Sequence, residues 1–243
     1  MAKQAYHHGN LRAALIAAAL KAIGEEGPEK FTLRDVARRA GVSAAAVYRH
    51  FRDKDDLLIA VAVDCEERIG AAMAEALAHA SEDPLERFRA TGIAYVTFAV
   101  DHPEHFRALS IPGLFERVPA EMQARAAERE AKQRRSIVEA QANGQIAQLP
   151  IADVQLTAEV VVAGLAHMIV EGRLGAVDRT RALELAIAVT RVLGVGFVPR
   201  PEALEDPRDQ VVVPATPNMS RSWYADGEPG APALPPGARS PRT

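Results

Sequence analysis

The sequence predicts an all-α protein with three parts: a three-helix, homeodomain-like helix-turn-helix domain at residues 1–56, a helical bundle at residues 57–198 and a disordered tail at residues 199–243. Hydrophobic residues make up 48% of the chain but aromatic residues only 5%, and alanine and leucine dominate, which favours helices over sheets. Apolar residues recur at helical spacing as far as about residue 197, whereas ten of the sixteen prolines fall in the tail.

The first predicted helix starts after Asn10, whose side chain can cap a helix N-terminus, and it stops between Gly24 and Gly27. Apolar residues follow one face of this helix. They are Leu11, Leu15, Ala18, Ala19, Ala22 and Ile23. We therefore expect one side of the helix to pack against the rest of the domain.

Two short helices then form the expected helix-turn-helix, in the segment FTLRDVARRAGVSAAAVYRHFRDKDDLL at residues 31–58. Thr32 is the expected cap of the helix at residues 33–40, and Gly41 follows where a left-handed backbone is commonly needed. Ser43 is the expected cap of the next helix. A small core is expected from Val36, Ala37, Val42, Val47 and Phe51. In the helix that follows Ser43, the face opposite this core then carries Ala45, Arg49 and Arg52.

Apolar spacing and capping residues also predict the helices of the bundle. They are expected at residues 54–80, 84–101, 103–110, 119–143, 153–173 and 178–197. Pro84, Pro103 and Pro119 lie near three of the starts, where proline is tolerated, and Asp153 and Asp178 are candidate N-caps. No segment shows a convincing strand pattern.

The tail at residues 199–243 is rich in proline, glycine, serine and arginine, so it cannot bury enough apolar surface to offset its ordering entropy. Trp223 and Tyr224 within it are a candidate docking patch, although a solvated tail is the favoured interpretation.

Charge and cysteine content narrow the function classes. The net charge is −3, but residues 1–60 hold ten Lys and Arg against seven Asp and Glu, so the basic excess lies where the helix-turn-helix is expected. The single Cys65 allows no disulfide within the chain, which suits the cytoplasm. No uninterrupted apolar run suggests a membrane span, and the N-terminus lacks the apolar core of a secretory signal.

Several motifs resemble one family in order and spacing. YHHGNLR at residues 6–12, FTLRDVARRAGVS at residues 31–43 and VYRHFRDKDDLL at residues 47–58 are similar to the DNA-binding domain of TetR-type (tetracycline-repressor-type) transcriptional regulators. HPEHFRAL at residues 102–109 and GLAHMIVEGRLG at residues 164–175 resemble pieces of one C-terminal class. The resemblance implies an all-helical domain for ligand binding and dimerisation after the DNA-binding domain.

The resemblance also implies roles for individual residues. Backbone contacts to double-stranded DNA are implied for Thr32, Tyr48, His50 and Lys54, and Ser43 caps the recognition helix. Ala44, Ala45, Ala46 and Arg49 match the base-facing positions, and Arg34 matches a position that reaches a guanine. Arginine can bond guanine O6 and N7 together, whereas an alanine methyl can only pack against a thymine methyl. The N-terminal arm, with Lys3, His7 and His8, is expected along the backbone or in the minor groove. Arg38 and Arg39 are interpreted as ordinary solvated charges.

A small-molecule pocket is expected among large or adaptable side chains of the bundle. The candidates are Phe88, Tyr95, Phe98, Phe106, Met122, His167 and Met168. Plain core packing is the competing interpretation for each of them. The last two helices, with the small residues Ala163, Gly164, Gly194 and Gly196, are expected to form a four-helix interface in a homodimer. Two recognition helices about one DNA turn apart, roughly 34–36 Å or a multiple, would read a palindromic operator.

The favoured hypothesis is therefore a ligand-responsive transcriptional regulator, expected to be a repressor, with no cofactor. An enzyme is the second hypothesis, but no GxSxG, HExxH or P-loop motif is found. A metal sensor using His102 and His105 in DHPEH is the third. A helix start at Pro103 is the favoured interpretation of this segment, and no metal site is predicted.

Overall fold

The computed structural model describes residues 11–196. This range contains nine α-helices, one 3-10 helix and no strand, which confirms the predicted all-α class. Some features named above lie outside the described residues: Lys3, His7, His8, the expected cap Asn10, the tail at residues 199–243, and Trp223 and Tyr224 within it.

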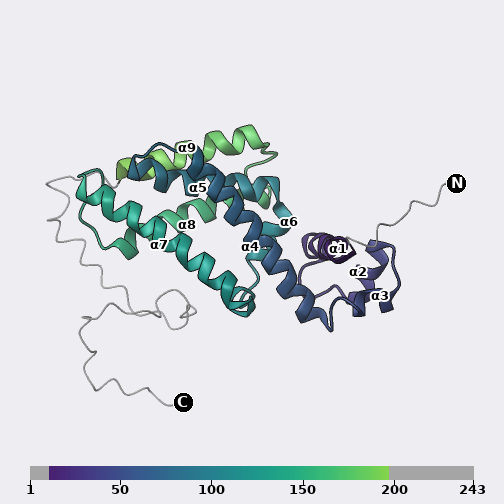
Figure 1. The fold of residues 1–243 in the computed structure, drawn as a ribbon. Helices are drawn as coiled ribbons and strands as arrows, with labels where there is room; N and C mark the ends of the chain where they lie inside the picture. Colours follow the sequence, from purple (N-terminus) through teal and green to yellow (C-terminus); the bar gives the residue numbers. More distant parts are fainter. Residues whose placement is uncertain (1–10, 197–243) are drawn as a thin grey trace, which may run out of the picture. The chain divides into compact units, whose positions relative to one another are not determined.

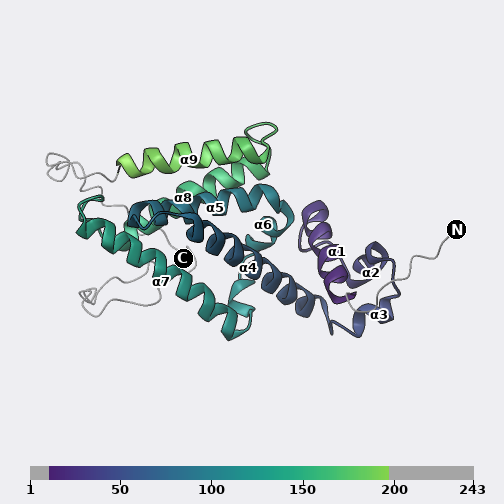
Figure 2. The same ribbon diagram turned by 45° about the horizontal axis from the view of Figure 1, so that its top comes forward.

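The first three helices are α1 (Leu11–Glu26), α2 (Leu33–Ala40) and α3 (Ala44–Tyr48). They gather beside the first half of the long helix α4 (Lys54–His79), as Figures 1 and 2 show from two directions. Helix α3 is shorter than its sequence pattern indicates, because the chain leaves the helix after Tyr48.

Local signals fix the turn of the helix-turn-helix. Thr32 and Asp35 form a reciprocal capping box at the start of α2. At its end, Gly41 adopts φ 69°, and the N–H groups of Gly41 and Val42 donate to carbonyl oxygens of the last turn. Ser43 then accepts a hydrogen bond from Ala46 N at 3.3 Å, which caps α3. These observations confirm the predicted caps and the left-handed glycine.

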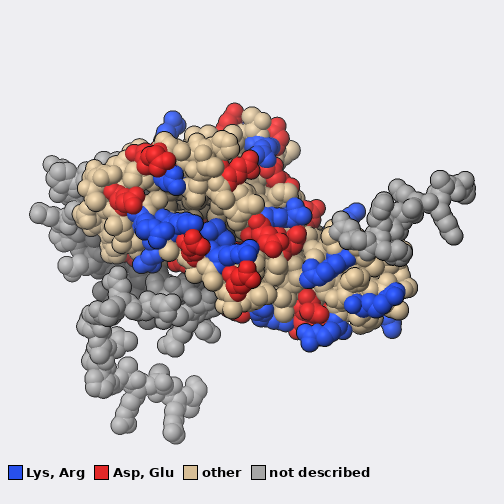
Figure 3. Space-filling view, in the orientation of Figure 1, with Lys and Arg blue, Asp and Glu red and all other residues tan. Residues whose placement is uncertain are grey.

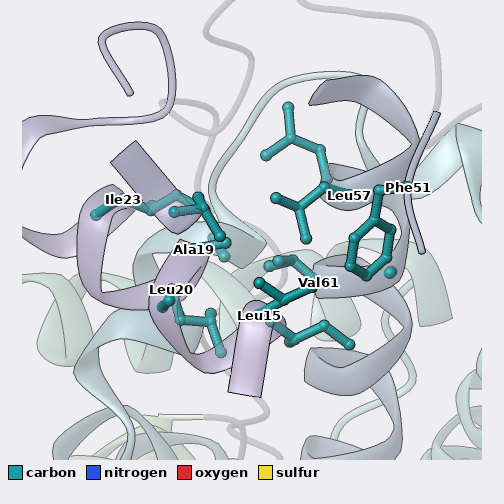
Figure 4. Close-up of a cluster of buried hydrophobic side chains, with 14 of the residues drawn as sticks. Leu15, Ala19, Leu20, Ile23, Phe51, Leu57 and Val61 are labelled. Carbon is teal, nitrogen blue, oxygen red and sulfur yellow. The ribbon is translucent and has the colours of Figure 1, made fainter. Parts of the chain in front are cut away.

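The core of this region joins the helix-turn-helix to α1 and α4. Figure 4 shows side chains of Leu15, Leu57 and Val61 converging beside Phe51, and all four are essentially inaccessible to solvent. The five apolar residues predicted for the motif core belong to the same cluster, although Val42 is only partly buried. Burial of these side chains is what holds the short helices, because helices of this length are not stable alone.

The remaining elements form a bundle around α5. They are α5 (Pro84–Asp101), α6 (Pro103–Leu109), η2 (Phe115–Arg117), α7 (Ala120–Ala142), α8 (Ile151–Val170) and α9 (Arg179–Gly196). Helix α5 packs against α4, α7, α8 and α9. Gly92 allows the close approach of α8, because a Cβ at this position would lie 3.1 Å from Val162 Cγ1.

The two aspartates predicted as N-caps in the bundle differ in their roles. Asp178 Oδ1 accepts from Arg181 N at 2.8 Å, which confirms its capping role at α9. The prediction that Asp153 caps α8 is wrong: the helix already begins at Ile151 after Pro150, and Asp153 lies in its first turn. Proline fixes the backbone at a position where its missing N–H costs nothing, so the chain turns helical earlier than expected.

Helix α8 is unusually apolar for a helix with exposed surface. Within residues 11–196 it is the one helix long and apolar enough, by length and composition, to cross a membrane, although polar residues interrupt its apolar sequence. It packs against α5, α7 and α9. Its outer side keeps an exposed row at a spacing of four residues: Leu156, Val160, Gly164 and Met168.

Candidate nucleic-acid interface and ligand cavity

The alanine run of α3 does not present all three methyl groups to the same side. Ala45 is exposed and Ala44 is half-buried, so both lie toward the outer surface of the motif. Ala46 is 7% exposed and packs inward beside Val47. The expectation that Ala46 faces a base is therefore corrected: its position one residue before Val47 turns it to the inner edge of the helix.

Exposed polar and aromatic side chains surround this edge. Tyr48 is 55% exposed, so its side chain lies outside the core. Arg49 and His50 follow it and are exposed, and Arg34 is exposed on α2. Within residues 11–196 neither Arg34 nor Arg49 forms an ion pair, whereas Arg38 pairs with Asp35 at 3.3 Å. Two cationic side chains thus remain available to an external partner.

The two capping hydroxyl groups are engaged within the protein. Thr32 Oγ1 donates to Asp35 Oδ2 at 2.6 Å, and Thr32 N donates to the same oxygen at 3.0 Å. These bonds hold the pKa of Asp35 below its usual value, with a smaller contribution from Arg38. Thr32 is nevertheless exposed, so its oxygen lies at the surface at the N-terminus of α2.

Lys54 and Arg39 form contacts that were not predicted from the sequence. Lys54 Nζ donates to the carbonyl oxygen of Glu29 at 2.8 Å. Arg39 forms ion pairs with Glu26 and, at 2.6 Å, with Glu25. The Arg39 side chain is only 18% exposed, so the interpretation of Arg39 as an ordinary solvated charge is wrong. Arg39 ties the end of α2 to the end of α1.

An open cavity of about 710 Å³ lies among α4, α5 and α7. Met73 and Leu77 of α4 and Phe88 of α5 contribute apolar lining, and α7 contributes a series of charged side chains. Glu66 of α4 is buried and forms an ion pair with Arg129 of α7, whose pKa is lowered by burial. The cavity is therefore more polar than the apolar pocket expected from the sequence.

Two of the seven candidate residues line this cavity, and the structure places the other five elsewhere. Phe88 and Met122 line the cavity. Phe98 and Phe106 are buried in the core, and Tyr95 packs edge-to-face on Phe106 with ring centres 5.8 Å apart. Burial raises the pKa of Tyr95 to about 12. The remaining two candidates are exposed on α8: Met168 lies in the outer row, and the ring of His167 packs on Phe106 with ring centres 4.7 Å apart.

The histidines of DHPEH serve the fold. Helix α6 begins at Pro103, which confirms the predicted helix start, and His102 is the residue between α5 and α6. His105 Nε2 lies 3.0 Å from Asp64 Oδ2 of α4. In the described part of the chain, no group of three or more His, Cys, Asp or Glu side chains is arranged to hold a metal ion.

Two family models match the chain. Residues 15–61 match the bacterial regulatory proteins of the tetR family, and residues 88–190 match the tetracyclin repressor-like C-terminal domain. The chain belongs to the TetR family. The first match contains the helix-turn-helix and the start of α4, and the second contains most of the bundle.

Curated relatives match part of the chain. The HTH-type transcriptional regulator BetI of Rhizobium meliloti is 34% identical over 90 residues, which are 37% of this chain and 43% of the relative. BetI of Burkholderia thailandensis is 43% identical over 79 residues, which are 32% of this chain and 40% of the relative. The chain thus spans about two fifths of the length of these curated relatives. These relatives are regulators of transcription.

Solved structures match over the bundle as well. A protein of unknown function from Rhodococcus sp. RHA1 is 31% identical, with a TM-score of 0.63, over 81% of this chain and 100% of that chain. The ketosteroid transcriptional regulator KstR2 of Mycobacterium tuberculosis has the same TM-score at 16% identity, over 80% of this chain and 98% of that chain. The TetR-family regulator PfmR of Thermus thermophilus has a TM-score of 0.60 at 20% identity, over 75% of this chain and 94% of that chain. The last two likenesses show the TetR fold alone.

Proposed function

We propose that this TetR-family regulator is a ligand-responsive repressor that acts in the cytoplasm, binds a palindromic operator as a homodimer and leaves it when a small-molecule effector binds. The observation that carries the proposal is the surface around α3. Ala44 and Ala45 leave a slim edge that permits close approach to the floor of the major groove, and the free guanidinium groups of Arg34 and Arg49 flank it.

In this proposal, different residues recognise the bases and contact the phosphates of the DNA. Arg34 and Arg49 supply the hydrogen bonds to base edges, and Ala44 and Ala45 supply apolar contacts. Phosphate contacts come from the exposed Tyr48 and His50 and from residues at helix starts, which fix the position of the protein without reading sequence. The residues at helix starts are Thr32, Ser43 and Lys54.

A homodimer is supported by the outer sides of α8 and α9. Val160 of α8 is 61% exposed and Val192 of α9 is 69% exposed. Helix α9, which packs against α8, carries a second exposed apolar set made of Leu183, Ile187, Val192 and Val195. Large apolar side chains exposed on two neighbouring helices favour an association site, and we assign it to a second copy of the chain in a two-fold dimer.

Helix α4 supports a ligand response. Leu57 and Val61, in its first half, are fully buried in the core of the DNA-binding region. Glu66, Gly70 and Met73, further along the same helix, line the cavity. An effector in the cavity can favour one position of α4 over another, and only a difference in its affinity for two states can shift their populations.

The decisive experiment measures binding of the purified protein to the DNA that flanks its own gene, by fluorescence anisotropy over a series of salt concentrations. We expect a specific complex with two chains per site and an affinity that falls steeply with salt, because cationic side chains displace counterions from phosphates. Equal affinity for unrelated DNA, or an affinity independent of salt, contradicts the proposal. Transcription from the same promoter in vitro, with and without the protein, separates repression from activation.

A further inference from the structure

The guanidinium group of Arg129 stands at the wall of the cavity with most of its hydrogen-bonding capacity unused. Its Nη2 donates to Oε1 of Glu66, whose side chain is 5% exposed. Within the described residues this is its single hydrogen bond, although an arginine carries five N–H donors. The Arg129 side chain is 26% exposed, so its remaining donors are open to the cavity.

Gly70 allows this guanidinium to lie close against α4. It lies one turn after Glu66 on α4, and a Cβ at Gly70 would be 3.2 Å from Nη1 of Arg129. Because glycine has no side chain, Nη1 rests over the backbone of α4. Glu66 thus occupies one N–H group of the Arg129 guanidinium, and the remaining N–H groups can face a second anion.

The cavity around Arg129 has room and apolar surface for more than an inorganic ion. Its volume of about 710 Å³ lies within the usual range for small-molecule sites, which is about 300–1,000 Å³. Met73, Leu77 and Phe88 line it from α4 and α5, and Met122 lines it from α7. These four side chains offer a surface on which an alkyl or ring system can be buried.

Arg87 and Arg129 are the half-buried arginines of the lining, and Arg87 already pairs with Glu82 at 3.9 Å. Lys132 pairs with Glu128 at 2.9 Å, and the acids Glu67 and Glu139 are exposed in solvent, where salt screens them. Arg135 also lines the cavity and forms no ion pair within residues 11–196. Figure 3 shows Lys and Arg side chains gathered over the middle of α7, with acidic side chains between them.

We propose that the ligand of this cavity is an amphipathic organic carboxylate, whose carboxylate binds the free N–H groups of Arg129 and whose apolar body packs on Met73, Leu77 and Phe88. The inference rests on the proposed function, because it names the chemical class of the effector. Arginine matches a carboxylate in geometry as well as charge, so two N–H groups can bind both oxygens. A ligand with a cationic head would meet Arg129 as a like charge.

The experiment compares three probes that share one alkyl tail and differ in the charge of the head group: decanoate, decanol and decyltrimethylammonium. Calorimetry with the full chain, without DNA and below the micelle concentration of each probe, measures their affinities. We expect decanoate to bind about tenfold more tightly than decanol, because hydrogen bonds between charged groups are the strong ones, and decyltrimethylammonium to bind most weakly. Equal affinities, preference for the cation, or no binding by decanoate overturns the inference.

Variants locate the binding group. Removing Arg129 alone would strand the buried charge of Glu66, so the test variant is the double substitution Glu66→Gln with Arg129→Gln, with circular dichroism to show that it is folded. It should lose the preference for decanoate over decanol, and a retained preference overturns the inference. Arg134→Gln, a neutralised arginine of α7 outside the lining, should keep the preference.

Should the double variant not fold, Arg129→Lys keeps a partner for Glu66 but loses the planar fork. It should bind decanoate several-fold more weakly and decanol unchanged, and an unchanged affinity for decanoate overturns the inference. The two proposals fail separately. Loss of the carboxylate preference with intact operator binding removes only the ligand class, whereas absent operator binding removes the proposed repressor whatever the cavity holds.

Discussion

Lys54 reaches back from the start of α4 to the chain before α2, where its Nζ donates to the carbonyl oxygen of Glu29 at 2.8 Å. The same nitrogen lies 4.5 Å from the centre of the Phe31 ring. The ammonium group therefore combines a hydrogen bond with a cation–π contact and holds the turn between α1 and α2 against α4. Lys54, which was expected only to contact the DNA backbone, therefore also stabilises the surface that is proposed to bind DNA.

Replacing Lys54 by alanine should therefore have two effects. Binding to all DNA sequences should weaken together, and the slope of log affinity against log salt should fall by about 1, because one phosphate contact is lost. The free energy of unfolding should also fall by about 1 kcal/mol, because the hydrogen bond to Glu29 is lost. Urea denaturation and anisotropy measure the two effects. Lys30→Ala, at an exposed lysine of the same turn, should leave stability unchanged.

Replacing Arg34 by alanine should change specificity rather than affinity for all sequences. Arg34 is exposed and free of ion pairs within the described residues, so it is available to a guanine. Its loss should cost about 1–3 kcal/mol at one base pair of each half-site and leave other positions unchanged. Selection of binding sites from a random DNA pool measures this preference. Arg38→Ala is the matched control, and a uniform loss of affinity in Arg34→Ala would refute its reading role.

Ala45 and Ala46 should respond in opposite ways to a larger side chain. Ala46→Leu should lower the free energy of unfolding by about 1–3 kcal/mol, because it overfills a packed interior beside Val47. Ala45→Leu should leave stability nearly unchanged and weaken operator binding, because the added bulk meets the floor of the groove. Thermal unfolding and operator affinity measured on both variants check this, and equal destabilisation by the two substitutions would contradict the assignment.

The sequence predicts the caps and turns around these two alanines but not which of the two is buried. Helix caps and turns follow from short local patterns, so Thr32, Gly41 and Ser43 were predicted correctly. The inward turn of Ala46 depends on the exact length and rotation of α3, which tertiary packing of Val47 and Phe51 decides. A run of identical residues carries no periodic signal from which that rotation could be read.

The cavity was harder to predict because it depends on pairs that are distant in sequence. Aromatic residues of the bundle were candidates for its lining, yet Phe98 and Phe106 fill the core. The groups that distinguish the cavity, Glu66 and Arg129, each look like ordinary surface charges in a helical pattern. Only the packing of α7 on α4 brings them together. The residue pattern of α4 or of α7 alone does not predict the contact between Glu66 and Arg129.

A charge on the exposed row of α8 should separate the proposed dimer. Val160→Glu places a carboxylate on a surface that is 61% exposed in the single chain, so the fold should tolerate it, whereas the interface should not. Analytical ultracentrifugation should show monomers, and cooperative operator binding should be lost. Val138→Glu, at an exposed valine of α7, should remain dimeric. A dimeric Val160→Glu protein would move the interface away from α8.

The burial of His105 beside Asp64 should make stability depend on pH. Burial lowers the pKa of His105 below 6.5, and Arg68 and His102 act in the same direction, whereas the hydrogen bond and charge of Asp64 act against it. Because the folded pKa is the lower one, the unfolded chain binds the proton first as the pH falls through 6.5. The free energy of unfolding should therefore decrease on acidification until the folded His105 is itself protonated.

Urea denaturation at a series of pH values between neutral and mildly acidic measures this dependence. In the variant His105→Gln, which keeps a hydrogen-bonding side chain beside Asp64 but cannot take up a proton in this range, the decrease should be smaller. His79→Gln, at an exposed histidine at the end of α4, is the matched control and should keep the dependence of the unmodified protein. An unfolding free energy that rises on acidification in the unmodified protein would show that Asp64 outweighs burial, because a raised folded pKa reverses the sign of the linkage.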